Sequence, residues 1–188
     1  LGRRGSPSDI LATPELLSQR GVQVHHIDRG GEATYHGPGQ LVGYPIVNLR
    51  AWGGGPLKYI RALEEIIVAA LADFGIAAAG AQRQTGVWVQ DAKIAAIGVK
   101  VSRGVTTHGF ALNVNPDLSY FDHIVPCGID GGRVTSMFSQ RPDLSDMEPV
   151  IQVLAHHFGR VFGWAMEWGS LDDLLQSTQP ASLAPSHR

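Results

Sequence analysis

The segment RGGEATYHGPGQL, from Arg29 to Leu41, joins two apolar stretches of the chain and contains four glycines. A tight connection between strands needs only about two to four residues, so this segment is longer than a turn requires. Glycine lets a backbone approach a ligand closely because no side chain intervenes. The segment is therefore either a glycine-rich hairpin loop or one wall of a binding site. Its length, together with Arg29 and His36, favours the binding site, but it lacks the Gly-Lys-Ser/Thr ending of a phosphate-binding loop.

Hydrophobic patterns on both sides of this segment predict an α+β domain with several strands and two main helices. Strands are expected at residues 22–27, 41–47, 86–90, 93–101 and 107–114. A long helix is expected from Pro56, which suits a first helical turn, to Gly75, which suits a helix end. Its inward stripe would comprise Leu57, Ile60, Leu63, Ile67, Leu71 and Phe74. A second helix is expected to start with a capping box from Ser145 to Glu148 and to end at Gly163.

The composition limits the partners that the chain can have. Its 188 residues are 44% hydrophobic and 17% charged, with a net charge of -2, which predicts a globular protein without a general attraction to nucleic acid or membrane. No stretch reads as a membrane span or a signal peptide. The single cysteine excludes an internal disulfide and favours a reducing compartment, so we expect a cytoplasmic location.

The chain contains no repeat and no linker, which predicts one domain at residues 1–168. Residues 169–188 are rich in Ser, Pro and Gln, have little to bury and are expected to form a mobile tail. The chain starts with leucine rather than methionine, so we expect it to begin within a longer gene product.

Two residues outside the glycine segment are candidates for covalent chemistry. Cys127 is flanked by Pro126 and Gly128, which predicts an exposed bend, although a lone cysteine is more often a small buried apolar residue. A lowered pKa would make this thiol a thiolate nucleophile. Lys93 begins the run KIAAIGV and is one of only three lysines among fifteen basic residues. It either extends its ammonium into water or is partly desolvated and takes the proton of Cys127.

The eight histidines offer a second partner for the cysteine. His108, in THGFALNV, would form a Cys–His pair of the kind found in cysteine hydrolases. The sequence leaves open whether Lys93 or His108 lies nearer to Cys127. Neither H-E-x-x-H nor C-x-x-C occurs, so we expect no metal site.

Four blocks of the sequence, in this order and spacing, resemble the lipoyl(octanoyl) transferases of lipoate biosynthesis. The blocks are RGGEATYHGPGQLVGYPIVNL, KIAAIGVKV, THGFALNV and PCGI, and the resemblance extends from the first residues to about Phe138. Four ordered blocks are a more specific signal than any one of them. These enzymes are octanoyl-[acyl-carrier-protein]:protein N-octanoyltransferases. They normally have a further segment before LGRRG, so the resemblance implies that part of the family domain is missing here.

The resemblance implies the fold of the lipoate and biotin protein ligases, a mixed sheet flanked by helices, with no metal, ATP or other cofactor. It implies that Cys127 forms an acyl thioester and that Lys93 lowers the pKa of its thiol. The donor would be octanoyl-acyl carrier protein, and the acceptors would be lipoyl domains of 2-oxoacid dehydrogenases and the glycine cleavage H protein. The residues implied to line the acyl site are Arg29, Gly30, Gly31, Glu32, Ala33, Thr34, Tyr35, His36, Ala96, Ile97, Gly98, Gly109, Phe110 and Ala111.

Three other functions stay open from the sequence. An ATP-dependent lipoate–protein ligase of the same fold would need ATP for activity. A thioesterase-type hydrolase would use Cys127 and His108 and would release a free acid instead of forming an amide. A non-catalytic module would bind acyl groups or carrier proteins, and its Cys127→Ser variant would behave like the parent.

Overall fold

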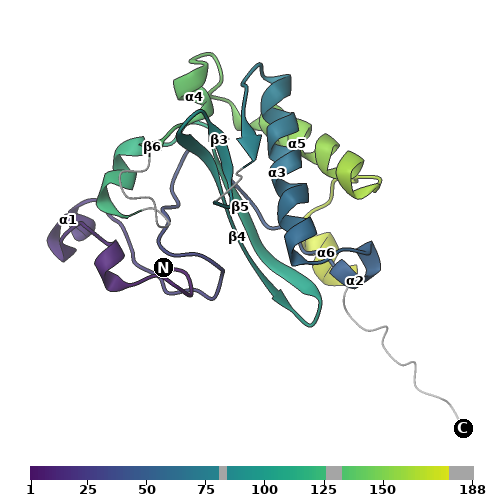
Figure 1. Cartoon of the computed structure of the whole chain (residues 1–188), viewed down its shortest axis with the longest axis horizontal. Coiled ribbons are helices and arrows are strands. Elements are labelled where there is room, and N and C mark those ends of the chain that lie inside the picture. Colours follow the sequence, from purple (N-terminus) through teal and green to yellow (C-terminus); the bar gives the residue numbers. More distant parts are fainter. Residues whose placement is uncertain (81–83, 126–132, 178–188) are drawn as a thin grey trace, which may run out of the picture.

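The computed structural model describes residues 1–80, 84–125 and 133–177. The strands form one sheet with the order β1-β5-β4-β3-β2, in which the neighbours are antiparallel, and β6 pairs with β4 in parallel. The strands are β1 (Gln40–Gly43), β2 (Ala79–Gly80), β3 (Val87–Val89), β4 (Ala92–Ser102), β5 (Val105–Asn113) and β6 (Arg133–Val134). The long β4–β5 hairpin lies at the centre of the sheet (Figure 1).

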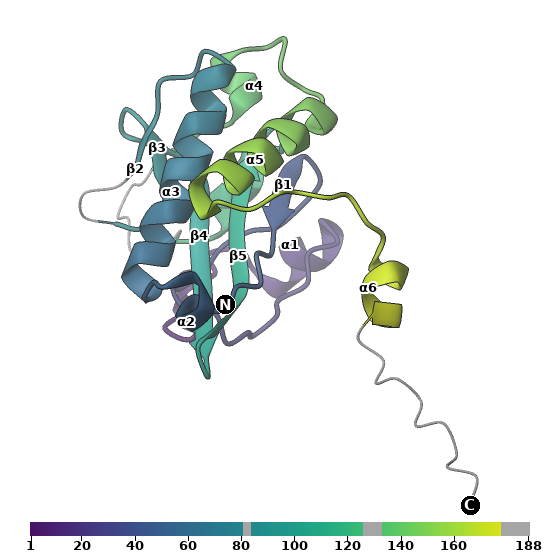
Figure 2. The same ribbon diagram turned by 90° about the vertical axis from the view of Figure 1, so that its right-hand side faces the viewer.

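Helices cover one face of this sheet. The helices are α1 (Pro14–Gln19), α2 (Leu49–Trp52), α3 (Pro56–Asp73), α4 (Met137–Gln140), α5 (Met147–Phe162) and α6 (Leu171–Ser177), with 3-10 helices at η1 (Pro7–Asp9) and η2 (Leu118–His123). Figures 1 and 2 show α3 and α5 side by side on one face, and α1 with the rest of the N-terminal chain on the other. The expected mixed sheet with flanking helices is confirmed. We call the face away from α3 and α5 the open face.

The hydrophobic core lies between the sheet and the α3–α5 pair. Leu63, Ile67 and Leu71 of the predicted stripe are buried there, whereas Leu57 is 67% exposed. Successive steps of three residues rotate around a helix, so Leu57 falls on a different face from Leu63. Tyr59, four residues before Leu63, takes the inward position and donates a hydrogen bond from its hydroxyl to Pro45 O at 2.9 Å.

The predicted strands are confirmed at β3, β4 and β5, and the prediction for residues 41–47 is confirmed in its first part by β1. The strand predicted at residues 22–27 is wrong, because these residues form no strand. Val22, Val24 and Ile27 line a large hollow instead of pairing with a sheet neighbour. Gln23 and His25 line the same hollow, so the segment borders it along both of its sides.

The second long helix starts one residue later than the capping box predicts. Asp146 caps α5, since its carboxylate accepts a hydrogen bond from the backbone N–H of Glu148 at 3.0 Å, and Ser145 lies outside the cap. Gly163, with φ of 71°, ends the helix as expected. Helix α6 lies within the expected tail, whose mobility stays a prediction. Within the described ranges, no helix is both long and apolar enough to cross a membrane.

The buried carboxylate of Glu64 joins α3 to the start of β3. Glu64 is 3% exposed, its Oε1 accepts a hydrogen bond from Gly86 N–H at 3.1 Å, and its Oε2 lies 2.5 Å from Arg61 Nη1. We expect Glu64→Ala to lower the free energy of unfolding by about 1–3 kcal/mol, because it leaves a buried donor unpaired. The exposed Glu65, 3.5 Å from Arg160, is the control, and Glu65→Ala should cost less than about 1 kcal/mol. Equal losses in urea denaturation would contradict this role of Glu64.

Candidate functional site

The glycine segment lies on the open face of the sheet and is held there by backbone contacts. Gly30 N–H donates a hydrogen bond to Val99 O of β4 at 3.1 Å. A Cβ at Gly98 would lie 3.0 Å from both Arg29 Cδ and Gly30 O, which is too close for an unstrained contact. The segment can therefore cross β4 at this height only because residue 98 has no side chain.

Arg29 shapes the segment from inside. It is 6% exposed, and its guanidinium donates hydrogen bonds to Gly30 O at 3.0 Å and to Glu32 O at 3.1 Å. The Glu32 carboxylate faces outward, 3.6 Å from Arg4 Nε. Arg29 thus fixes the turn that brings the segment onto the sheet.

A hollow of about 80 Å³ lies between this segment and the β4–β5 hairpin. Nine of the residues expected at the acyl site line this hollow, namely Arg29, Thr34, His36, Ala96, Ile97, Gly98, Gly109, Phe110 and Ala111. His108 lines it as well. The structure therefore brings three sequence blocks that are far apart in the chain to one place.

The remaining five expected residues do not line this hollow. Ala33 and Tyr35 face a second hollow of about 570 Å³, which also borders Arg29, Thr34 and His36. Gly30, Gly31 and Glu32 line neither hollow. These three residues form the turn of the segment and so position the flanking residues that line the hollows.

An aromatic cluster that the sequence analysis missed supports the segment in the larger hollow. The ring of Tyr35 stacks on Tyr120 at 4.9 Å and meets the edge of Phe121 at 5.5 Å. The Arg20 guanidinium lies 5.4 Å from the Tyr120 ring centre. Burial raises the pKa of the Tyr35 hydroxyl, so this group stays neutral near pH 7. Tyr120 and Phe121 belong to η2. No local sequence pattern indicates that η2 packs against the glycine segment.

A chain of polar groups connects His36 to the strand that carries Lys93. His36 Nδ1 lies 3.2 Å from Gln40 Oε1, and Gln40 Nε2 donates a hydrogen bond to Asn113 Oδ1 at 2.9 Å. Asn113 Nδ2 then donates to Thr135 O at 3.0 Å, and Thr135 N–H donates to Lys93 O at 3.0 Å. Gln40, Asn113, Thr135 and Lys93 are all buried. His36 and Lys93 therefore belong to the same end of the site.

The network also assigns the tautomer of His36. Gln40 Oε1 accepts a second hydrogen bond, from Gly37 N–H at 3.3 Å, so His36 Nδ1 must be the donor in its contact with Gln40. In the neutral ring, Nε2 then carries the lone pair. The imidazole is open to water on one side, but the protein atoms around it lower its pKa below 6.5, an effect that the Gln40 hydrogen bond opposes.

A β-bulge turns Lys93 onto the open face. Val87 pairs with Ala95 while the next residue, Trp88, pairs with Lys93, so β4 has one extra residue, Ile94, at this point. Paired residues lie on the same face of a sheet, and Val87 belongs to the core. Lys93 therefore shares the opposite face with Trp88, whereas simple alternation from Ala95 would point it toward the helices.

Lys93 is the buried one of the three lysines. It is 8% exposed, and its Nζ lies 4.8 Å from the centre of the Trp88 ring. Lys58 is exposed beside Trp52, and Lys100 forms an ion pair with an exposed aspartate. Of the two alternatives that the sequence left open for Lys93, its low exposure agrees with partial desolvation, although Lys93 is not among the described residues that line the 80 Å³ hollow.

Cys127 lies in residues 126–132, outside the described ranges, so its distance to Lys93 or His108 stays open. The described chain resumes at β6, where Val134 pairs with Lys93. The Nε2 atom of His108 lies 2.8 Å from Asp28 Oδ1. In the described ranges, no group of three His, Cys, Asp or Glu side chains is arranged to hold a metal ion.

Comparisons with known proteins point to one family. The model of the lipoyl protein ligase A/B catalytic domain matches residues 1–159. The octanoyltransferase of Acidobacterium capsulatum is 48% identical over 184 residues, a match that covers 89% of this chain and 74% of that protein. The mitochondrial octanoyltransferase LIP2 of Arabidopsis thaliana is 40% identical over 182 residues, covering 95% of this chain and 77% of that protein.

Solved structures agree on the fold. A lipoate-protein ligase A bound with ATP aligns with a TM-score of 0.69 at 15% identity, covering 94% of this chain and 75% of that one. The biotin protein ligase of Aquifex aeolicus aligns with a TM-score of 0.54 at 16% identity, covering 87% and 68%. At such identities the likeness concerns the fold and not the chemistry.

His36 should titrate below the pKa of a free imidazole. We expect an NMR titration to place its pKa below 6.5, and Gln40→Ala to lower it further, because the amide oxygen that favours the protonated ring is removed. A histidine with a lowered folded pKa binds fewer protons than the unfolded chain, so its contribution to stability is lost as the pH falls through 6.5. If His36 titrates in the folded protein with a pKa equal to or higher than in the urea-unfolded chain, the assignment is contradicted.

Proposed function

The chain belongs to the lipoyl protein ligase A/B catalytic-domain family and is an acyltransferase of its octanoyltransferase branch, and we propose that it transfers octanoate from acyl carrier protein to a protein lysine through a thioester on Cys127. One observation carries this proposal. Lys93, buried and turned onto the open face by a bulge, is paired with the strand that follows the Cys127 segment.

In the first half-reaction, the Cys127 thiolate attacks the thioester carbonyl of the donor. The bond from Cys127 Sγ to the acyl carbon forms, and the bond from this carbon to the carrier sulfur breaks. Lys93, having taken the proton of Cys127, returns it to the departing carrier thiolate. One thioester replaces another, so the exchange needs no ATP.

In the second half-reaction, the amine of an acceptor lysine attacks the thioester on Cys127. The amide bond forms, the sulfur leaves as a thiolate, and Lys93 in its neutral form accepts the proton that the amine loses. Burial of Lys93 favours the neutral amine, while the Trp88 ring favours the ammonium. These opposed influences suit a group that must both accept and release a proton.

The hollow beside Gly98 suits the acyl chain, and His36 suits the carbonyl end. Each methylene that the hollow buries contributes about 0.8 kcal/mol to binding. A dry site also protects the thioester from hydrolysis. His36 belongs to the same end of the site as Lys93, so its Nε2 is suited to accept a hydrogen bond from the attacking amine. The acyl chain would extend from this end along β4.

The acceptors are lipoyl domains, which we propose to be those of 2-oxoacid dehydrogenases and the glycine cleavage H protein. One similar structure, the bipartite lipoate protein ligase of Thermoplasma acidophilum, is described with its E2 lipoyl domain and aligns with a TM-score of 0.72. We propose octanoyl-acyl carrier protein as the donor and a reducing compartment, such as the cytoplasm, as the location, because a thiolate on Cys127 must stay unoxidised.

The decisive experiment mixes the protein with octanoyl-acyl carrier protein and an apo lipoyl domain. We expect octanoyl amide without ATP, and an intact mass of the enzyme raised by one octanoyl group that hydroxylamine removes. Cys127→Ser should form neither product. A requirement for ATP would favour a ligase, free octanoate in place of amide would favour a hydrolase, and an unchanged Cys127→Ser would indicate a binding module.

The role of Lys93 can be separated from its charge. Lys93→Arg keeps the cation but cannot act as a base near neutral pH, so we expect it to lose at least about 100-fold in rate while the fold is retained. Lys58→Arg, at the exposed lysine beside Trp52, should act like the parent. Retained activity in Lys93→Arg would reduce the residue to an electrostatic role. Near-parental activity in Lys93→Ala would transfer the role to His108.

A further inference from the structure

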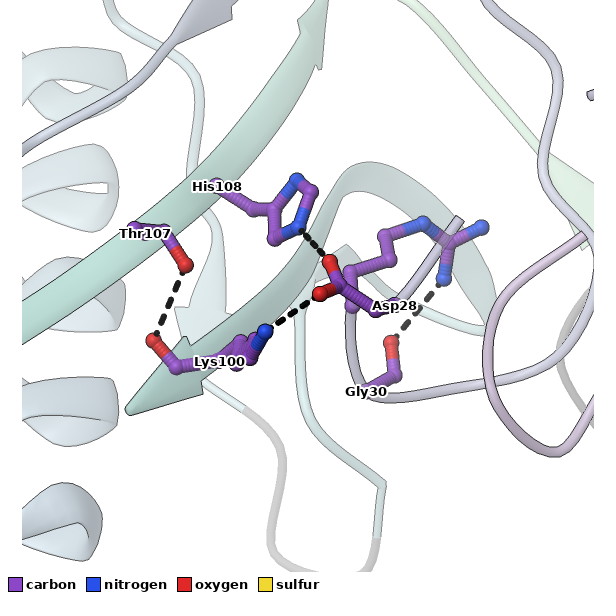
Figure 3. Close-up of polar contacts among 6 residues, drawn as sticks. Asp28, Gly30, Lys100, Thr107 and His108 are labelled. Atoms are coloured by element: carbon purple, nitrogen blue, oxygen red, sulfur yellow. Dashed lines mark hydrogen bonds and ion pairs between the residues drawn. The ribbon is translucent and has the colours of Figure 1, made fainter. Parts of the chain in front are cut away.

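An ion cluster formed by Asp28, Lys100 and His108 lies where the glycine segment begins. Asp28 Oδ1 is 2.8 Å from His108 Nε2, and Asp28 Oδ2 pairs with Lys100 Nζ. Figure 3 shows both basic side chains pointing toward the Asp28 carboxylate, from the two strands of the central hairpin. Hydrogen bonds from Lys100 and then His108 lower the pKa of Asp28 to about 2, so it is ionised throughout the neutral range.

The cluster lies at the opposite end of the open face from Lys93. After the bulge, the open-face positions of β4 are Ala96, Gly98 and Lys100, in this order away from Lys93. Their partners on β5 are Ala111, Gly109 and Thr107. Glycine and alanine thus form a strip of small residues along the hairpin. The charged Lys100 and its partner Asp28 follow at the end of this strip. At the usual strand rise, Lys100 lies about 13 Å beyond Ala96.

His108 stands between two hollows. It lines the 80 Å³ hollow under the glycine segment, and with Asp28 it lines an open surface hollow of about 600 Å³ that also borders Arg3 and His26. Its backbone is left-handed, with φ of 61°, a conformation that is uncommon for a residue other than glycine. The Asp28 contact holds the ring of His108 in this position, and His108 forms the wall between the two hollows together with Ile27, which also lines both.

We propose that the cluster of Asp28, Lys100 and His108 is the stop that sets the maximum acyl chain length. This inference rests on the proposed octanoyl transfer. With the carbonyl at the Lys93 end, a medium chain ends in the small hollow near Gly98. A longer chain would have to push its apolar end into paired charges, which desolvates them without a compensating contact. Asp28 and Lys100 act here as positioning residues, and His108 forms the wall.

Two substitutions open this wall in different ways. Asp28→Ala removes the carboxylate that holds both basic side chains. His108→Asn shortens the wall residue with one that tolerates a left-handed backbone. We expect both variants to weaken the His108 part of the wall, so that a longer chain can pass beside Ile27 into the surface hollow. Asp143→Ala is the control, because Asp143 is an exposed carboxylate paired with Arg141 at 2.8 Å, and we place it in no part of the site.

The experiment measures transfer from carrier-bound hexanoyl, octanoyl, decanoyl and dodecanoyl groups, and binding of the matching free fatty acids by calorimetry. In the parent and in Asp143→Ala, we expect each methylene up to the stop to strengthen binding about fourfold, and longer chains to gain nothing. In Asp28→Ala and His108→Asn, the preference for dodecanoyl over octanoyl should rise by roughly tenfold or more.

Two failures are distinguishable. If the parent transfers octanoate but the dodecanoyl-to-octanoyl ratio is unchanged in both folded variants, the stop is wrong and the proposed function stands. If His108→Asn lowers the transfer rate equally for donors of every chain length, His108 serves the reaction itself and the stop is also wrong. If the parent acylates neither Cys127 nor a lipoyl domain with any donor, the proposed function fails, and the inference falls with it.

Discussion

A side chain at residue 98 would occupy the space in which Arg29 and Gly30 cross the sheet, and the rest of the site depends on that crossing. The hydrogen bond from Gly30 to Val99 sets the height of the glycine segment above β4. That height determines how much room remains under Thr34 and His36. Because backbone packs here on backbone, the part of the hollow beside Gly98 has a fixed shape, and side chains such as Ile97, Phe110 and His108 complete its walls.

The polar groups at the two ends of this hollow obey different physical rules. At the His36 end, neutral groups exchange hydrogen bonds through Gln40 and Asn113, which places donors and acceptors without burying a net charge. At the Asp28 end, full charges are paired where water still reaches them, so their desolvation cost is small. Chemistry therefore fits the buried end, and exclusion of apolar chains fits the charged end.

The sequence predicts the parts of this structure that depend on local signals. The glycine segment, strands β4 and β5 and the two long helices follow from glycine content, apolar periodicity and helix-end residues, and the meeting of the glycine segment with β4 and β5 at one site was expected from the family resemblance. The bulge at Ile94 could not be predicted, because it depends on which residue of β3 pairs with Lys93. The false strand at residues 22–27 has a related cause, since an apolar alternation does not say whether a sheet or a hollow faces it.

A lipoate-protein ligase A that shares this fold is described with bound ATP, so the fold by itself does not fix the chemistry. An acid must be activated before it can form an amide, whereas a thioester is already activated, so a transferase needs a nucleophile where a ligase needs a nucleotide. Under the proposed mechanism the difference lies in Cys127 and Lys93, so these two residues carry more information about function than the architecture does.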